Sequence, residues 1–318
     1  MKKTILALTI PALFATSASA VTVYSDQGAQ VDVYGRIQYD IGELKGANNE
    51  DIGGDGKARL GVNVKYNVNN DVDLIGKFES EVAAESSQNG KFNSRYAWAG
   101  FRFMGTTDLT FGKSENPFVQ LSDVTDIFNL WGASAYSHNW RVDDQIRVSY
   151  ADQGFDLRAA YAFADDNRTS DTVGAKNQYS LSAGYAFATG PGELGLVAAY
   201  EARNSNEVNS DEEEWGLGAN FSIDGFYFGA TYGETDFDAG SDERFWEVAA
   251  SYNVDAWTLG AAYNNRKETQ GAKDKLVDEY LLAVQYALNS KAKLYGEYVI
   301  NDLSNSNDRY GVGIQYNF

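Results

Sequence analysis

The chain has 318 residues, and 45 Asp and Glu against 26 Lys and Arg give it a formal net charge of −19. It has no cysteine, which excludes a disulfide scaffold, a thiolate metal site and a thiol nucleophile. So acidic a chain lacks the basic surface that phosphate backbones require, and we exclude nucleic acid as a partner. An aromatic content of 14% is too high for a disordered chain.

The N-terminus has the pattern of a secretory signal peptide. Lys2 and Lys3 precede a short apolar run, and a small-x-small cleavage motif ends at Ala20. The run is too short to cross a bilayer as a helix. We predict that residues 1–20 are a signal peptide and that residues 21–318 form the mature chain, with a net charge of −21.

Apolar and polar residues alternate along the mature chain, which predicts β-strands with one apolar and one polar face. At the C-terminus, for example, the apolar positions are Tyr310, Val312, Ile314, Tyr316 and Phe318. Counting such segments gives sixteen strands, starting near Gln30, Lys57, Asp71, Phe92, Asp108, Trp140, Gly154, Gln178, Glu193, Glu213, Gly225, Glu243, Ala256, Val277, Lys291 and Asp308.

The connections between these strands alternate in length, with seven short turns and eight long loops. A transmembrane barrel requires this pattern, because its turns at one end are tight and its external loops are longer. The alternative is a soluble exported β-sandwich or β-helix, which has no reason to place every short turn at one end. We predict an all-β fold, a closed antiparallel transmembrane barrel of sixteen strands. The barrel and the signal peptide together place the chain in a cell outer membrane, after export through the periplasm.

One long connection differs from the others. Residues 114–139 form the third long loop, which is about twice as long as the next and unusually apolar. An external loop in water does not need such a composition, whereas a loop folded against the inside of the wall does. A sixteen-stranded barrel encloses an aqueous lumen, so we predict that this loop folds inward and narrows it.

Several segments carry a resemblance to a known family. They are Val31-Asp32-Val33-Tyr34-Gly35-Arg36, Ala58-Arg59-Leu60-Gly61, Ser94-Arg95-Tyr96-Ala97-Trp98-Ala99-Gly100-Phe101, Phe111-Gly112-Lys113 and the terminal Phe318. In their order and spacing the chain resembles the trimeric sixteen-stranded general diffusion porins of Gram-negative outer membranes. The resemblance implies a homotrimer of water-filled channels for passive diffusion of small hydrophilic solutes and ions.

In porins of this kind, a row of basic residues on the barrel wall lies opposite acidic residues on the inserted loop. By motif, the bases here are Arg36, Arg59, Arg95 and Arg141. Strand parity also directs them into the lumen, with Arg95 opposing an outward Tyr96 and Trp98.

The acid side matches the family less well. Asp126 matches the first acid of the family's inserted loop. Leu130 stands where the family has its second acid. Asp123 and Glu115 are the candidates to replace that missing acid. The sequence therefore leaves cation or anion preference open.

Two other functions are compatible with a porin barrel. One is a substrate-selective channel, which often has an aromatic ladder in its lumen, and luminal Trp is expected to be scarce here. The other is a surface adhesin whose external loops carry the activity. We expect no enzymatic activity: His138, the single histidine, is the only candidate base for a hydrolase, and we interpret it as a loop residue.

The resemblance also implies contacts outside the channel. Phe318, with Tyr316 before it, resembles the terminal signal read by the outer-membrane assembly machinery. No metal or cofactor is expected. The acidic run Glu212, Glu213 and Glu214 is predicted in an external loop, as a solvated and self-repelling stretch. The alternative is that divalent cations bridge it to lipopolysaccharide phosphates.

Overall fold

A computed structural model describes residues 20–45, 52–83, 92–164, 175–205, 211–271, 274–304 and 306–318. The predicted signal peptide lies outside this part, except for Ala20. The described residues form the following elements: β1 (Val21–Asp26), β2 (Ala29–Glu43), β3 (Gly53–Asn69), β4 (Val72–Ala83), β5 (Phe92–Phe103), β6 (Thr107–Glu115), α1 (Val119–Ser122), β7 (Arg141–Asp152), β8 (Phe155–Ala162), β9 (Ala175–Thr189), β10 (Gly192–Ser205), β11 (Glu212–Ile223), β12 (Phe226–Phe237), β13 (Glu243–Val254), β14 (Trp257–Glu268), β15 (Lys275–Ala287), β16 (Ala292–Asn301) and β17 (Arg309–Asn317). No helix in the described ranges is long and apolar enough to cross a membrane.

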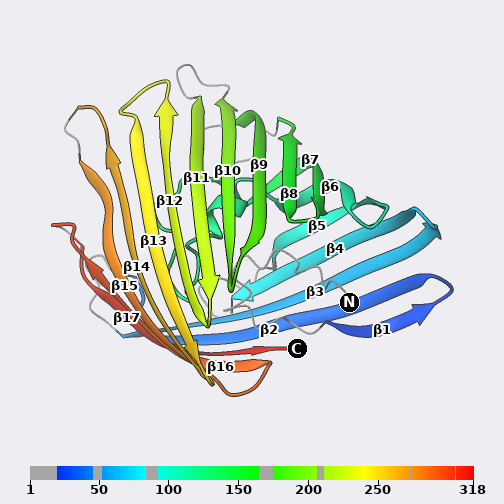
Figure 1. The fold of residues 1–318 in the computed structure, drawn as a ribbon, viewed down its shortest axis with the longest axis horizontal. Coiled ribbons are helices and arrows are strands. Elements are labelled where there is room, and N and C mark those ends of the chain that lie inside the picture. The colour runs from blue at the N-terminus through cyan, green and yellow to red at the C-terminus, as the bar shows by residue number, and fades with distance from the viewer. Residues whose placement is uncertain are drawn as a thin grey trace.

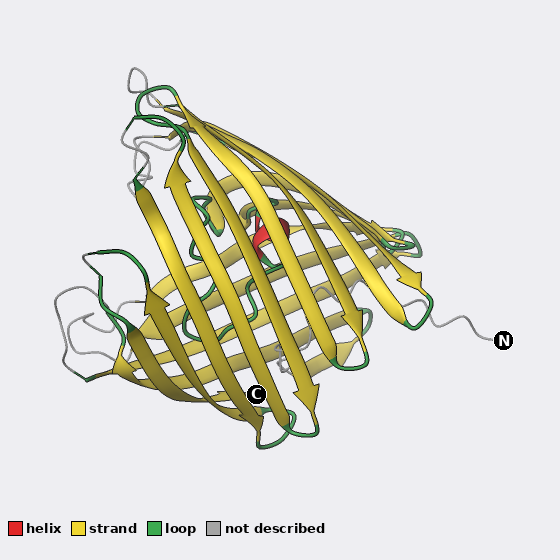
Figure 2. Cartoon of the chain, turned by 60° about the vertical axis from the view of Figure 1, so that its left-hand side comes forward, coloured by secondary structure: helices red, strands yellow, loops and turns green. Residues whose placement is uncertain are grey.

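Strands β2 to β17 form a closed barrel of sixteen antiparallel strands. Each pairs with its neighbour in the chain, and β17 pairs with β2 to complete the ring (Figures 1 and 2). Connections of two to four residues join β3 to β4 and every second pair after it, and longer ones join the rest. The predicted fold class is confirmed, and each predicted strand start lies within four residues of the observed one.

The prediction missed β1, a seventeenth strand that lies outside the ring. It forms a hairpin with β2 through Gln27 and Gly28, both with positive φ. β1 pairs with the first residues of β2, and β17 pairs with the later ones. The two chain ends therefore share one edge of β2, which leaves little of that edge unpaired.

The prediction that Glu212, Glu213 and Glu214 lie in an external loop was also wrong. Glu212, Glu213 and Glu214 begin β11 and pair with β10, so they belong to the wall. Glu214 points inward and is fully buried, whereas Glu213 accepts a hydrogen bond from the hydroxyl of Tyr200 at 2.9 Å. Strand parity separates their side chains, and the three carboxylates do not form one surface cluster.

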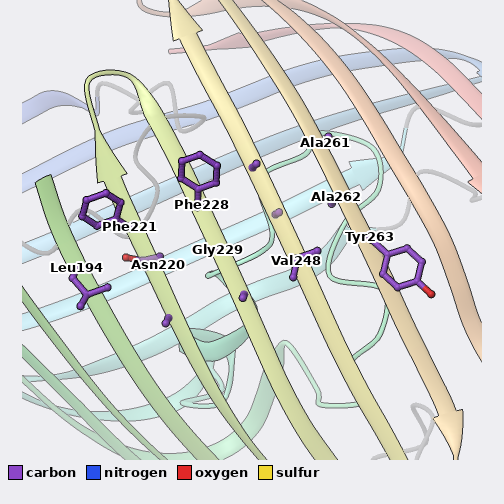
Figure 3. A pocket seen from close by; sticks show the side chains of 13 residues that line it. Leu194, Asn220, Phe221, Phe228, Gly229, Val248, Ala261, Ala262 and Tyr263 are labelled. Atoms are coloured by element: carbon purple, nitrogen blue, oxygen red, sulfur yellow. The ribbon is translucent and has the colours of Figure 1, made fainter.

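The two faces of the wall are inverted relative to a soluble protein. Outward side chains such as Leu60, Leu181 and Leu282 are each more than 50% exposed, while inward Glu201 and Glu247 are fully buried. Large apolar side chains are exposed on nearly every strand, which only a lipid environment stabilises. The outer face also has an apolar hollow of about 550 Å³ over β10–β14, where alanines lie between Leu194, Phe221 and other large side chains (Figure 3).

The barrel seam depends on a glycine. Gly35 and Phe318 exchange backbone hydrogen bonds of 2.9 and 3.0 Å, and the Phe318 ring covers Gly35. A Cβ at position 35 would lie 2.3 Å from the ring and 2.6 Å from the carbonyl oxygen of Arg59. Only glycine allows both β3 and the terminal ring to approach this closely.

Gly35→Ala should therefore destabilise the seam by about 1–3 kcal/mol, the usual cost of overpacking. The measurement is gel electrophoresis after heating to increasing temperatures. It gives the temperature at which the faster-migrating folded barrel converts to the slower-migrating unfolded chain. Gly53→Ala is the control, because a Cβ at Gly53 has no atom within 4 Å. Equal transition temperatures for the two variants would contradict this description of the seam.

Candidate functional site: the inserted segment and the facing arginines

The inserted segment, residues 116–140, connects β6 to β7 and includes α1, which lies inside the barrel (Figure 2). Its apolar side chains pack on the inner face of the wall and are shielded from water. In one cluster Phe118, Leu121, Val124 and Ala135 of the segment contact Val197, Ala199 and Phe245. In a second, Ile127 packs among Tyr227, Ala249, Ala262, Leu281 and Val299. Burying these groups offsets the cost of ordering a long loop.

Glycines of the inner wall make room for this packing. A Cβ at Gly216 would lie 2.3 Å from Leu121 Cδ2, and a Cβ at Gly229 would lie 2.1 Å from the carbonyl oxygen of Val124. The segment therefore lies against bare backbone at these points. Close packing explains why glycine recurs on these strands.

Buried glutamates from the same half of the wall hold the polar groups of the segment. Glu297 accepts three backbone N–H groups, from Asn129 at 2.6 Å, Leu130 at 3.0 Å and Trp131 at 3.2 Å. Glu247 accepts the Thr125 hydroxyl at 2.5 Å and the Ala135 N–H at 2.9 Å. Further bonds run from Asn116 to Glu201, from Ser134 to Glu279 and from Ser137 to Glu214. Bonds to a carboxylate are each worth about 1.5–3 kcal/mol, so the segment is fixed at several points.

The four predicted arginines lie together opposite this segment. Arg36, Arg59, Arg95 and Arg141 line one cavity of about 520 Å³. Its other side is formed by residues of the segment, among them Asp123, Asp126, Asn129 and Leu130. Arg36 and Arg59 are directly opposite each other in the β2–β3 register.

The arginines differ in their partners. Arg59 forms an ion pair with Glu81, and Arg95 Nε donates to Glu79 at 2.5 Å. Arg36 Nε donates to the amide oxygen of Asn317 at 3.3 Å, and the Arg141 guanidinium stacks on Tyr96 at 4.9 Å. Within the described ranges, neither Arg36 nor Arg141 has a carboxylate within ion-pair distance.

The parity argument for Arg95 was wrong, although the residue does line the cavity. Tyr96 and Trp98 pair in register with Glu79 and Lys77, which places them on the inner face. The register shifts between Ser94 and Tyr96, so Arg95 occupies a bulge. The bulge turns Arg95 inward beside Tyr96.

The acids of the site have distinct environments. Glu115 ends β6 and accepts hydrogen bonds from Arg158 at 3.4 Å and from the Tyr96 hydroxyl at 3.3 Å. Burial, and then the nearby charge of Glu297, together raise the pKa of Asp126 to about 7. The pKa of Asp123 is also raised, mainly by burial and then by Glu115.

Two features of the cavity were not predicted. Trp131 and Trp140 line it, so the expectation that luminal Trp is scarce was wrong. Glu79 and Glu81 also lie beside the arginines. The alternation of residues in the sequence does indicate that these two side chains point inward. Lys77, Glu79 and Glu81 occupy alternate positions of β4, opposite in parity to the outward Phe78.

His138 is buried among Phe118, Tyr136 and Trp140, with ring centroids 5.1 to 5.5 Å away. Burial lowers its pKa to about 3, so the ring is neutral, and Nε2 lies 3.3 Å from Ser122 Oγ. Within the described ranges, no group of three or more His, Asp or Glu side chains is arranged to hold a metal ion.

Comparison with known proteins agrees with this geometry. A family model described as Gram-negative porin matches residues 7–306. The chain belongs to the Gram-negative porin family. It is 25% identical to outer membrane porin F of Escherichia coli strain K12, over the full length of both chains.

Two solved structures share the fold. One is Salmonella typhi OmpF in complex with daunomycin, with 18% identity, a TM-score of 0.82, and 94% of this chain and 100% of that chain covered. The other is the trimer form of Vibrio cholerae OmpT, with 20% identity, a TM-score of 0.71, and 92% and 100% covered. The protein is thus a porin of the outer membrane, a channel for passive diffusion and not an enzyme.

The packing of the segment predicts that Gly229→Ala enlarges the channel. Its Cβ would meet the backbone of Val124, which cannot rotate away, so docking should weaken by about 1–3 kcal/mol. Single-channel recording should show a higher or noisier conductance than wild type. Gly260→Ala is the control, since a Cβ there meets its nearest atom at 3.6 Å. Identical conductance traces for the two variants would contradict the docked arrangement.

Proposed function

We propose that the 520 Å³ cavity is the constriction of the channel. A single observation carries this: arginines of the wall and carboxylates of the segment line the same cavity from opposite sides. Arg36, Arg59, Arg95 and Arg141 supply the positive side, and Asp126 and Asp123 the negative side. Glu115, which ends β6 opposite Arg141 in the β6–β7 register, adds a carboxylate on the wall side. The transverse field between them orients small dipolar solutes and disfavours apolar ones, which have no dipole to align.

A substrate-selective channel is the second candidate. It is supported by Trp131 and Trp140, which line the cavity and offer flat faces to a sugar ring. Uptake of sugars of increasing size into liposomes separates the two functions. A general pore gives rates that fall smoothly with size, whereas a selective one saturates with one class of sugar.

The proposed partners follow from the family. A homotrimer is supported by the trimer form of the related Vibrio cholerae structure. We further propose that residues 1–20 direct export and that lipopolysaccharide and outer-membrane lipid surround the barrel. The alternative of an adhesin assigns activity to the external loops, of which residues 46–51, 84–91, 165–174 and 206–210 lie outside the described residues.

We also propose that Phe318 and Tyr316 form the terminal signal for the assembly machinery. Both are at the end of the chain, with their rings stacked 6.1 Å apart. Deleting Phe318 should lower the yield of assembled barrel. Gly35→Ala keeps the terminal sequence, so it should lower stability without slowing assembly, and normal assembly after the deletion would refute the signal.

The role of Asp126 has a direct electrical test. Asp126→Asn removes one negative charge from the cavity, so the reversal potential in a KCl gradient should shift toward chloride. A unit charge about 4–8 Å from the ion path in water is worth about 0.5–1 kcal/mol, or a two- to five-fold change in permeability ratio.

The same residue predicts a dependence on pH. With a pKa of about 7, Asp126 is charged above neutrality and loses its charge as the pH falls through 7. Wild-type selectivity should therefore shift toward anions between pH 8 and pH 6, and Asp126→Asn should remove most of that shift. A variant indistinguishable from wild type at pH 8 would exclude Asp126 from the constriction.

A further inference from the structure

The bases of the inner wall differ between its two halves. On β10–β17 they contact acids or the inserted segment: Arg203 bonds Glu201, Arg266 bonds Glu243, and Arg309 bonds Glu279. Those that line the cavity come from β2, β3, β5 and β7. The route past the arginines therefore follows the half of the wall that the segment leaves uncovered.

Arg147 lies on that same half, further along β7. It pairs in register with Thr110 of β6 and Ala160 of β8. It is six residues beyond Arg141, which corresponds to about 20 Å along a strand. Since β7 runs from the inserted segment to the short turn before β8, a solute entering from the long-loop end meets Arg147 after the constriction.

The neighbouring arginines are bonded directly to acids, and Arg147 is not. One row closer to the short turn, Arg102 binds both oxygens of Asp108 at 2.7 Å, and Arg158 binds Asp156 at 3.0 and 2.7 Å. Within the described ranges, the Arg147 side chain has neither a hydrogen-bond acceptor nor a carboxylate at ion-pair distance. Its Nε is buried and has no partner.

An unsatisfied buried donor costs about 1–3 kcal/mol, and a charged one costs more. A half-buried guanidinium beside a water-filled lumen can regain this energy from a solute. Its planar fork matches two oxygens of one oxyanion, whereas chloride offers a single point of contact.

We propose that Arg147 is a second contact for small oxyanions, with inorganic phosphate as the representative ligand, beyond the arginine constriction. An oxyanion that leaves Arg36 and Arg141 reaches Arg147 before the short-turn end of the channel. The inference rests on the proposed function, because it assumes that solutes pass the arginine constriction along the half of the wall that the segment leaves uncovered. It extends that function by predicting that the channel prefers oxyanions to chloride because of Arg147, a residue outside the constriction.

The test compares single-channel conductance in potassium phosphate and in KCl. Arg147→Gln should lower the phosphate-to-chloride conductance ratio by about two- to five-fold, the effect of one unit charge at about 4–8 Å in water. Arg147→Lys keeps the charge and loses the fork. It should leave the KCl reversal potential unchanged and still lower the phosphate ratio.

Arg102→Gln is the matched control, because it removes an arginine that is already bonded to Asp108. It should change the ratio less than Arg147→Gln. Wild-type ratios in both Arg147 variants would overturn the proposal, as would an equal fall in Arg102→Gln, which would show that only net charge matters. If Arg147→Gln fails to assemble, Arg147→Lys decides alone. Failure of the constriction appears separately, as an absent reversal-potential shift in Asp126→Asn.

Discussion

The inserted segment is bound to one half of the inner wall, and the path through the barrel depends on that contact. Two apolar clusters and a set of buried glutamates on β10–β16 hold it there. The apolar clusters supply the favourable burial, and the carboxylates satisfy backbone N–H groups that the irregular segment would leave unpaired.

This contact divides the lumen into two halves of different chemistry. The half built from β10–β16 is filled, and its glutamates are occupied by hydrogen bonds to the segment. The other half keeps its charged side chains facing water, with Arg36, Arg59, Arg95 and Arg141 around one cavity. Although the chain is strongly acidic, the cavity therefore presents bases on its wall side. Net charge alone says little about which ions pass, because position decides which charges an ion meets.

The strands were predictable from the sequence, because period-two alternation directly reports which face a residue occupies. The bases of the candidate site were predictable because their positions match family motifs. The errors have local causes. The bulge at Arg95 inserts a residue and breaks the parity that was used to orient Tyr96 and Trp98. The role of Glu297 was invisible, since its partners lie more than 160 residues away in the segment. Alternation shows that a side chain points inward but does not show what it meets there.

The docked position of the segment can be measured by cysteine labelling, since the native chain has no cysteine. Ala199, on the inner face of β10, is only 7% exposed because the segment covers it, whereas Asn63 of β3 lies on the inner face of the uncovered half. With a small water-soluble thiol reagent applied to the folded channel, Asn63→Cys should react rapidly. Ala199→Cys should react only after unfolding. Equal rates in the folded channel would contradict the account, because the segment would then leave both halves of the wall open to water.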